Sequence, residues 1–224
     1  MLHIQQRLKN LKSQLPEHVQ LVAVSKTKLV SVILQAYHAG QRVFGENKVQ
    51  ELQAKYPEMP KDIQWHMIGH LQTNKVKYIA PWIDMIHAVD RMKLLRSINK
   101  EAAKAERTID CLLQFHIAEE DTKFGLDMRE AEQMLESESF QGFENIRIRG
   151  VMGMATFTED MEQVRREFKH LKSIFEQLKS RFFPNSNAFS EISMGMSGDY
   201  KIAIEEGATI VRIGSTIFGA RETN

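Results

Sequence analysis

The stretch "LVAVSKTKLVSVILQAYHAG" at residues 21–40 contains one complete strand–loop–helix unit, and its repetition along the chain predicts the fold. Four apolar residues at 21–24 predict a buried strand, and the polar "SKTK" that follows predicts a loop. The segment "SVILQAYHAG" predicts a helix that ends at Gly40. A strand followed by a helix is the repeating unit of parallel sheets.

Seven further apolar runs predict strands, and helix-like stretches separate nearly all of them. The eight candidate strands lie near Val22, Val43, Trp65, Met85, Leu113, Val151, Ile192 and Val211. Eight such units in 224 residues predict a single α/β domain over residues 1–224, a (β/α)8 TIM barrel. An open doubly wound parallel sheet is the alternative.

Composition narrows the class of protein. The 30 Lys and Arg balance the 29 Asp and Glu, so charge gives no reason to expect a nucleic-acid or membrane partner. The single Cys111 excludes an intramolecular disulfide. Charges in the N-terminal helical stretch argue against a signal peptide, and no run is long enough to span a membrane. We therefore expect a cytoplasmic protein. His66 and His70 lie in a strand and a turn, so no metal site is expected.

Candidate functional residues follow the predicted strands, because both architectures place their chemistry at the carboxyl ends of the strands. Lys26 follows the first strand, and a buried ammonium is costly unless it is paired or neutralised. A lysine in such a place can act as an amine nucleophile toward a carbonyl. From spacing alone, the favoured interpretation is that Lys26 is a surface lysine, as is expected of Lys28.

The segments "SMGMSGDYKIAI" and "RIGSTIFGAR" resemble phosphate-binding loops. Gly214 permits a close backbone approach, and Ser215 offers an N–H and a hydroxyl. A phosphate pocket beside a lysine suggests an aldehyde that bears a phosphate, and pyridoxal 5′-phosphate (PLP) fits, with Lys26 as its Schiff-base lysine. Arg212 would face the pyridine nitrogen. The alternative is that "RIGS" is an ordinary strand end.

Several motifs occur in order along the chain: "AVSKTK", "FGENKVQE", "WHMIGHLQTNK", "GVMGMATF" and "SMGMSGDYKIAIEEGATIVRIGSTIFGAR". With them the sequence resembles the pyridoxal-phosphate homeostasis proteins, which are single-domain barrels related to the N-terminal domain of alanine racemase. The resemblance implies a barrel of the alanine racemase N-terminal type with PLP as its cofactor, held as a Schiff base on Lys26. It also implies a protein that carries or buffers PLP for vitamin B6 homeostasis and has no established catalytic activity.

The resemblance implies a set of cofactor-binding residues and no catalytic or metal-binding ones. Arg212 is expected at the pyridine nitrogen, four residues around the phosphate, and Asn47 and Met152 at the ring. The full set is Lys26, Asn47, Met152, Ser193, Ser197, Arg212, Gly214 and Ser215. Expected partners are PLP and, as candidates, PLP-dependent apoenzymes, and the expected state is a monomer. His116 stands where many relatives carry an asparagine, which changes the local polarity if that position faces the cofactor.

Two alternative functions stay open. The relationship to alanine racemase raises a PLP-dependent amino-acid racemase or a weak lyase. A racemase uses a tyrosine from a second domain as its second base, and none of Tyr37, Tyr56, Tyr78 and Tyr200 is an obvious candidate. No second domain is expected after the barrel. The other alternative is an interaction protein without a cofactor.

Overall fold

Eight parallel strands form a closed barrel in the computed structural model, which describes residues 2–119 and 124–220. The strands follow one another around the barrel in sequence order. Each of the eight predicted strands is present, and the (β/α)8 fold is confirmed. The strands are β1 (Gln20–Val24), β2 (Val43–Glu46), β3 (Gln64–Met67), β4 (Met85–Val89), β5 (Ile109–Gln114), β6 (Ile146–Met152), β7 (Glu191–Ser193) and β8 (Ile210–Ile213).

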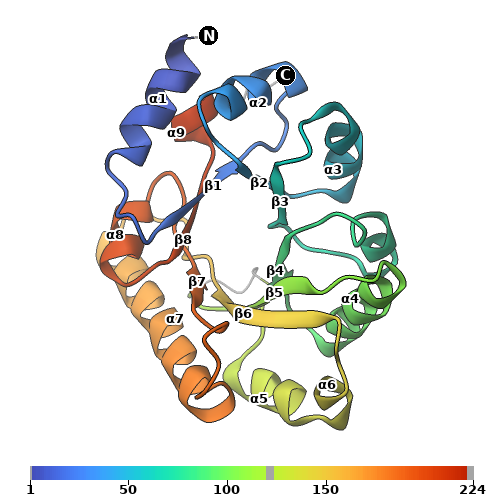
Figure 1. Ribbon diagram of the computed structural model, residues 1–224. Coiled ribbons are helices and arrows are strands. Elements are labelled where there is room, and N and C mark those ends of the chain that lie inside the picture. Colours follow the sequence, from blue (N-terminus) through green and yellow to red (C-terminus); the bar gives the residue numbers. More distant parts are fainter. Residues whose placement is uncertain (1, 120–123, 221–224) are drawn as a thin grey trace.

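Helices surround the barrel, and the first helix packs beside the last, α1 against α9 (Figure 1). The α-helices are α1 (Leu2–Lys12), α2 (Val30–His38), α3 (Val49–Lys55), α4 (Met92–Lys104), α5 (Met128–Glu136), α6 (Glu138–Gln141), α7 (Met161–Phe182), α8 (Tyr200–Glu205) and α9 (Ser215–Phe218). Two 3-10 helices, η1 (Tyr56–Glu58) and η2 (Thr73–Tyr78), lie in the connections on either side of β3.

Side chains of the barrel strands alternate between two apolar cores, as the pleat of a strand requires. Outward-facing residues such as Phe44 and Trp65 pack in a core shared with the helices, which includes Phe168 of α7. Inward-facing residues such as Val22 and Leu112 fill a smaller core inside the barrel. Because the interior is filled, a ligand site has to lie at one of the two ends of the barrel.

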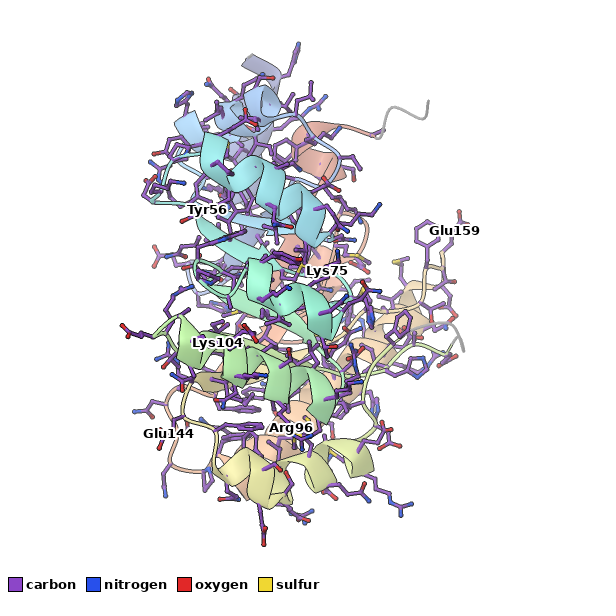
Figure 2. All side chains as sticks on the ribbon, turned by 90° about the vertical axis from the view of Figure 1, so that its right-hand side faces the viewer. Tyr56, Lys75, Arg96, Lys104, Glu144 and Glu159 are labelled. Carbon is purple, nitrogen blue, oxygen red and sulfur yellow. The ribbon has the colours of Figure 1, made fainter. Side chains whose placement is uncertain are left out.

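The barrel closes because β1 pairs with β8 as well as with β2, and Val22 lies beside Arg212 in this pairing. This closure rules out the open doubly wound alternative. All strands are parallel, so their carboxyl ends lie together at one end. Glu159, in the loop between β6 and α7, lies there, whereas Lys104 and Glu144, which precede β5 and β6, lie on the opposite side (Figure 2).

Short helical segments are where the structure departs from the predicted elements. The segment before Pro81 forms a 3-10 helix, η2, over Thr73–Tyr78. The four-residue helices α6 and α9 were not predicted, since four residues show no helical period.

The longest helix, α7, is capped at its start. The side chain of Asp160 accepts hydrogen bonds from the N–H groups of Glu162 and Gln163. Charged residues are spread along this helix. Neither α7 nor any other helix in the described part of the chain is long and apolar enough to cross a membrane.

Candidate functional site

A cavity of about 650 Å³ opens at the carboxyl ends of the barrel strands. This volume is in the range of small-molecule binding sites. Six of the eight predicted cofactor-binding residues line it, namely Lys26, Asn47, Ser197, Arg212, Gly214 and Ser215. The cavity therefore brings together the strand-end residues, and their contact with a cofactor stays a prediction.

Lys26 lies in a tight turn that follows β1. The N–H of Lys28 donates to the carbonyl of Ser25 at 3.0 Å, so Lys26 and Thr27 are the central residues of the turn. Lys26 is partly buried and lines the cavity. Lys28 is also partly buried and lines the same cavity, with its Nζ 3.3 Å from the carbonyl of Ala220. The turn therefore brings both lysines to one cavity, a placement of Lys28 that was not predicted.

A buried ion cluster lies beneath this turn. The Ser25 hydroxyl donates to Glu46 Oε1 at 2.6 Å, and Lys55 Nζ donates to the same oxygen at 2.7 Å and to the Ser25 carbonyl at 3.0 Å. Burial raises the pKa of Glu46 to about 7, although Lys55 acts in the opposite direction. These contacts tie α3, the end of β1 and the end of β2 together.

Arg212 reaches the cavity from inside the barrel. It is the third residue of β8 and faces inward like Ile210, two residues earlier. Its Nη1 donates to Ser193 Oγ at 2.6 Å, and its Nη2 donates to the Gly153 carbonyl at 3.0 Å. Burial lowers the pKa of Arg212 to about 10, against the opposing effect of Asp199. The guanidinium is thus a fixed cation at neutral pH.

A buried hydrogen-bond chain continues from Arg212 through the barrel. Ser193 Oγ lies 3.0 Å from His87 Nδ1, and His87 Nε2 lies 2.9 Å from His66 Nδ1. Burial lowers the pKa of His66 to about 3 and that of His87 well below its usual range, so both imidazoles are neutral at pH 7. A guanidinium only donates, so Ser193 accepts from Arg212 and is free to donate to His87. We therefore assign the Nε2–H tautomer to both histidines, since Ser193 Oγ then donates to His87 Nδ1 and His87 Nε2 donates to His66 Nδ1.

Met152 and Ser193, the other two predicted residues, lie below the cavity and are not part of its lining. Each is the last residue of its strand, the two pair with one another, and both are fully buried. Met154, two residues farther along the same face, lines the cavity in place of Met152. Ser193 instead supports Arg212. Their contact with a cofactor stays a prediction, and a strand-end pattern does not reveal at which residue the pairing stops.

Apolar side chains near the mouth of the cavity were missed by the sequence reasoning. Phe124 and Phe157 line the cavity and are 60% and 100% exposed, and Met161 and Met196 line it as well. The fully exposed Phe157 side chain is not stabilised by packing against the rest of the protein, so packing does not explain its place at the mouth of the cavity. The signal was available, because Phe157 follows the predicted sixth strand by a few residues.

His116 and the tyrosines lie outside the lining of the cavity. His116 is partly buried in the connection after β5. Tyr200 packs into the main core, and its hydroxyl lies 3.3 Å from Gln14 Oε1. Tyr200 is therefore a packing residue.

The two histidines considered as metal ligands are separated by the fold. His66 is buried inside the barrel, whereas His70 lines the cavity. Over the part of the chain that the structure describes, no group of three or more His, Cys, Asp and Glu side chains is arranged to hold a metal ion.

Two glycines allow loops to approach closely at the cavity. A Cβ atom at Gly69 would lie 2.5 Å from the Asn47 carbonyl, and one at Gly214 would lie 3.1 Å from the Val24 carbonyl. The Gly214 N–H is 3.4 Å from Ser197 Oγ. The loops after β7 and β8 therefore meet at the cavity, where the Ser197 hydroxyl and the Gly214 N–H lie together.

Comparison with known proteins identifies the family. The family model described as "Alanine racemase, N-terminal domain" matches residues 2–222. A "Pyridoxal phosphate homeostasis protein" from Vibrio alginolyticus is 38% identical over 98% of each chain. One of the same name from Aquifex aeolicus is 38% identical over 91% of this chain and 87% of its own. This chain belongs to the pyridoxal phosphate homeostasis protein family. The predicted resemblance is confirmed.

Solved structures of a relative extend the likeness to three dimensions. PipY of Synechococcus elongatus without PLP is 36% identical, with a TM-score of 0.90, over 96% of this chain and 100% of PipY. PipY with PLP bound is 35% identical, with a TM-score of 0.86 and the same coverage. PLP therefore binds to a protein that shares the fold of this pyridoxal phosphate homeostasis family member along nearly its whole length.

Proposed function

We propose that this chain binds PLP in the cavity at the carboxyl ends of its strands and carries or buffers it for PLP homeostasis. The observation that carries the proposal is the convergence on one cavity of an amine, a fixed cation and a glycine–serine loop: Lys26, Arg212 and Gly214–Ser215. The PLP-bound structure of PipY supports it. PLP has an aldehyde that an amine can bind, a pyridine nitrogen that a cation can face, and a phosphate that a glycine–serine loop can hold.

Lys26 would hold the aldehyde end. Its Nζ forms a C–N bond with the aldehyde carbon, the carbonyl oxygen leaves as water with the two amine hydrogens, and a Schiff base remains. The step needs no oxidant or reductant. Because Schiff bases hydrolyse by the reverse route, a protein that holds PLP in this way can also release it, which suits a carrier or buffer.

The loops after β7 and β8 would hold the phosphate. Ser197, Gly214 and Ser215 line this side of the cavity, and the contact between Gly214 and Ser197 already joins the two loops. Backbone N–H groups and hydroxyls in such a loop favour an oxyanion. Arg212 would meet the pyridine nitrogen. A cation at this nitrogen keeps it unprotonated and weakens the ring as an electron sink, which favours holding the cofactor over turning over a substrate.

The racemase alternative receives less support from the cavity. Two-sided proton transfer at an amino-acid α-carbon needs a base on each face. All four tyrosines of the chain, at positions 37, 56, 78 and 200, lie outside the lining of the cavity. The carrier function therefore agrees better with the residues present.

The proposal extends to a monomer that exchanges PLP with apoenzymes through the mouth of the cavity. Phe124 and Phe157 are exposed at that mouth, where an apoenzyme would approach the cofactor. Light scattering of the purified protein tests the monomer. Recovery of activity by a PLP-free aminotransferase, mixed with the loaded protein in the presence of a scavenger of free PLP, tests direct exchange.

A titration of the cofactor-free protein tests PLP binding. We expect PLP to saturate the visible absorbance of a Schiff base at one equivalent per chain. Pyridoxal, which has the same aldehyde but no phosphate, is the matched control and should bind at least about tenfold more weakly, because it loses charge-assisted hydrogen bonds. Equal binding of the two aldehydes, or binding that never saturates, would contradict the proposal.

A further inference from the structure

One helix holds the backbone on both sides of Lys26. The carbonyl of Ser25, in the peptide group before Lys26, accepts from Lys55 Nζ at 3.0 Å. The N–H of Thr27, in the peptide group after Lys26, donates to Glu51 Oε2 at 2.6 Å. These two peptide groups define the backbone dihedrals of Lys26, so α3 fixes the direction in which the lysine side chain leaves the chain.

The turn is strained at the same point. Thr27 has φ of 66°, the left-handed region that β-branched residues avoid. Glu106, in the connection between α4 and β5, is the other non-glycine residue with positive φ in the described part of the chain. Strain of this kind persists only where the surroundings impose it, and here the bond to Glu51 lies directly on the strained residue.

The ion cluster of Glu46, Glu51 and Lys55 lies beside this turn, and burying such a cluster costs free energy. Lys55 is 7% exposed, and its three ammonium hydrogens are taken by Ser25, Glu46 and Glu51, the last at 2.9 Å. A buried ion cluster usually stabilises a fold no more than apolar side chains of the same volume would. General stability therefore does not explain why two carboxyl groups, a buried ammonium and a strained turn occur together beside Lys26.

We propose that Glu51 and Lys55 are positioning residues for Lys26: they hold the turn in the conformation that aims the amine at the aldehyde. This inference rests on the proposed capture of PLP by Lys26. Glu51 holds the peptide group after the lysine, and Lys55 holds the one before it. Neither side chain lines the cavity, so each acts through the backbone of the turn.

The test compares PLP affinity among folded variants, measured by the absorbance of the Schiff base, with the melting temperature recorded in parallel. Glu51→Ala removes the acceptor of the Thr27 N–H, and Lys55→Met removes the donor to Ser25. We expect each to weaken the PLP Kd by about tenfold. Glu51→Gln keeps a side-chain oxygen for Thr27 and should stay within about threefold of the native chain.

A double variant tests the route through Thr27. Glycine adopts the left-handed conformation without strain, so Thr27→Gly should reduce the effect of Glu51→Ala on affinity. Two controls lie away from the cavity. Lys104→Met removes an exposed ion pair with Glu101, and Glu106→Gly relieves the other left-handed residue. Both controls should leave the PLP Kd unchanged.

Unchanged affinity in folded Glu51→Ala and Lys55→Met, with only the melting temperature lowered, would show a merely structural cluster and overturn the inference. If either variant fails to fold, the other one decides, because each acts on a different peptide group. Failure of the proposed function has a distinct signature, since the native chain itself would then form no Schiff base. A native chain that captures PLP at Lys26, with variants that do so equally well, refutes the positioning role alone.

Discussion

The position of the Arg212 guanidinium is fixed by Ser193, a residue that does not line the cavity. Ser193 accepts the Arg212 Nη1–H at 2.6 Å inside the barrel, and His87 and His66 continue the chain away from the cavity. Each member is buried and each depends on its neighbour for a partner. The orientation of the cavity cation is therefore determined one layer below the cavity.

Replacing Ser193 should destabilise the folded protein. Ser193→Ala leaves Arg212 Nη1 and His87 Nδ1 without their present partners, and an unsatisfied buried polar group costs about 1–3 kcal/mol. We expect urea unfolding to show a loss of stability in this range. Ser180→Ala is the control, because this exposed hydroxyl of α7 bonds only to the Gln177 carbonyl, and its loss should cost less than about 0.5 kcal/mol. Equal losses of stability in the two variants would contradict the role of Ser193 in the buried hydrogen-bond chain.

The two buried histidines predict the pH dependence of stability. Their pKa values are lowered in the folded protein, so below the unfolded value of 6.5 the unfolded chain takes up protons that the folded chain excludes. The contribution of the two histidines to the free energy of unfolding therefore falls as the pH falls below 6.5. Each histidine contributes at most about 1.4 kcal/mol per pH unit.

Glu46 acts in the opposite direction. Its folded pKa of about 7 exceeds the value of 4.5 for an exposed glutamate, so the folded state holds a proton that the unfolded state releases between these values. Its contribution to stability falls as the pH rises through this window and partly offsets the histidines.

A variant separates these contributions. His87→Gln should make the acid slope between about pH 5 and about pH 6 shallower by up to about 1.4 kcal/mol per pH unit, because one excluded proton is removed. Stability measured by urea unfolding at several pH values checks it. His3→Gln on α1 is the control, because that side chain stays exposed in the folded protein. A slope unchanged in His87→Gln would refute this explanation of acid sensitivity.

At the scale of elements, β7 is the shortest strand of the barrel. It has three residues and pairs with β6 through three residue pairs, the first of which is Gly150 and Glu191. A Cβ atom at Gly150 would lie 1.8 Å from the Glu191 carbonyl oxygen and 2.9 Å from its nitrogen. Both are backbone atoms in the sheet, so neither can move without breaking the pairing.

Gly150→Ala should therefore disrupt the pairing between β6 and β7. We expect a loss of about 3 kcal/mol or more, or failure to fold, since overpacking against backbone cannot be relieved by a side-chain rotation. Gly198→Ala is the matched control, because a Cβ there has nothing within 4 Å. Thermal unfolding distinguishes them. Similar melting temperatures for Gly150→Ala and the native chain would contradict the close approach.

The elements also show what sequence patterns can and cannot predict. All eight strands were predicted, because each is an apolar run bounded by polar residues. Which inward-facing residue near the end of β6 reaches the cavity was not predictable. Met152 and Met154 have the same residue type and face the same way, yet only Met154 lines the cavity. The end of the β6–β7 pairing decides between them, and that depends on a partner strand about forty residues away.

At the scale of the molecule, closure is what assembles the site. The pairing of β1 with β8 places Val22 beside Arg212 and so brings the turn at Lys26 near the loop at Gly214. Alternating strands and helices predicted a parallel sheet, but they fit an open sheet as well. The preference for a barrel rested on the number of units and on the family resemblance, since pairing between the first and last strands leaves no local pattern.

The residues that hold the backbone around Lys26 could not be predicted from the sequence either. Glu46, Glu51 and Lys55 belong to a strand end and a helix, where charged residues normally meet solvent. Their burial beneath the turn follows from the packing of α3 against the ends of β1 and β2. The sequence could select the lysine of the site, but it could not reveal the groups that hold that lysine.

The central claim is that Lys26 captures PLP, and mapping of the captured cofactor tests it most directly. The protein is incubated with PLP, reduced with borohydride, digested and analysed by mass spectrometry. Lys28 lines the same cavity and is the internal control for any amine that merely lies nearby. We expect one reduced pyridoxyl group per chain on the peptide that contains Lys26, with the modification on Lys26 and none in Lys26→Ala at one equivalent of PLP. A label on Lys28 in the native chain, or a full label at another lysine in preference to Lys26, would contradict the account.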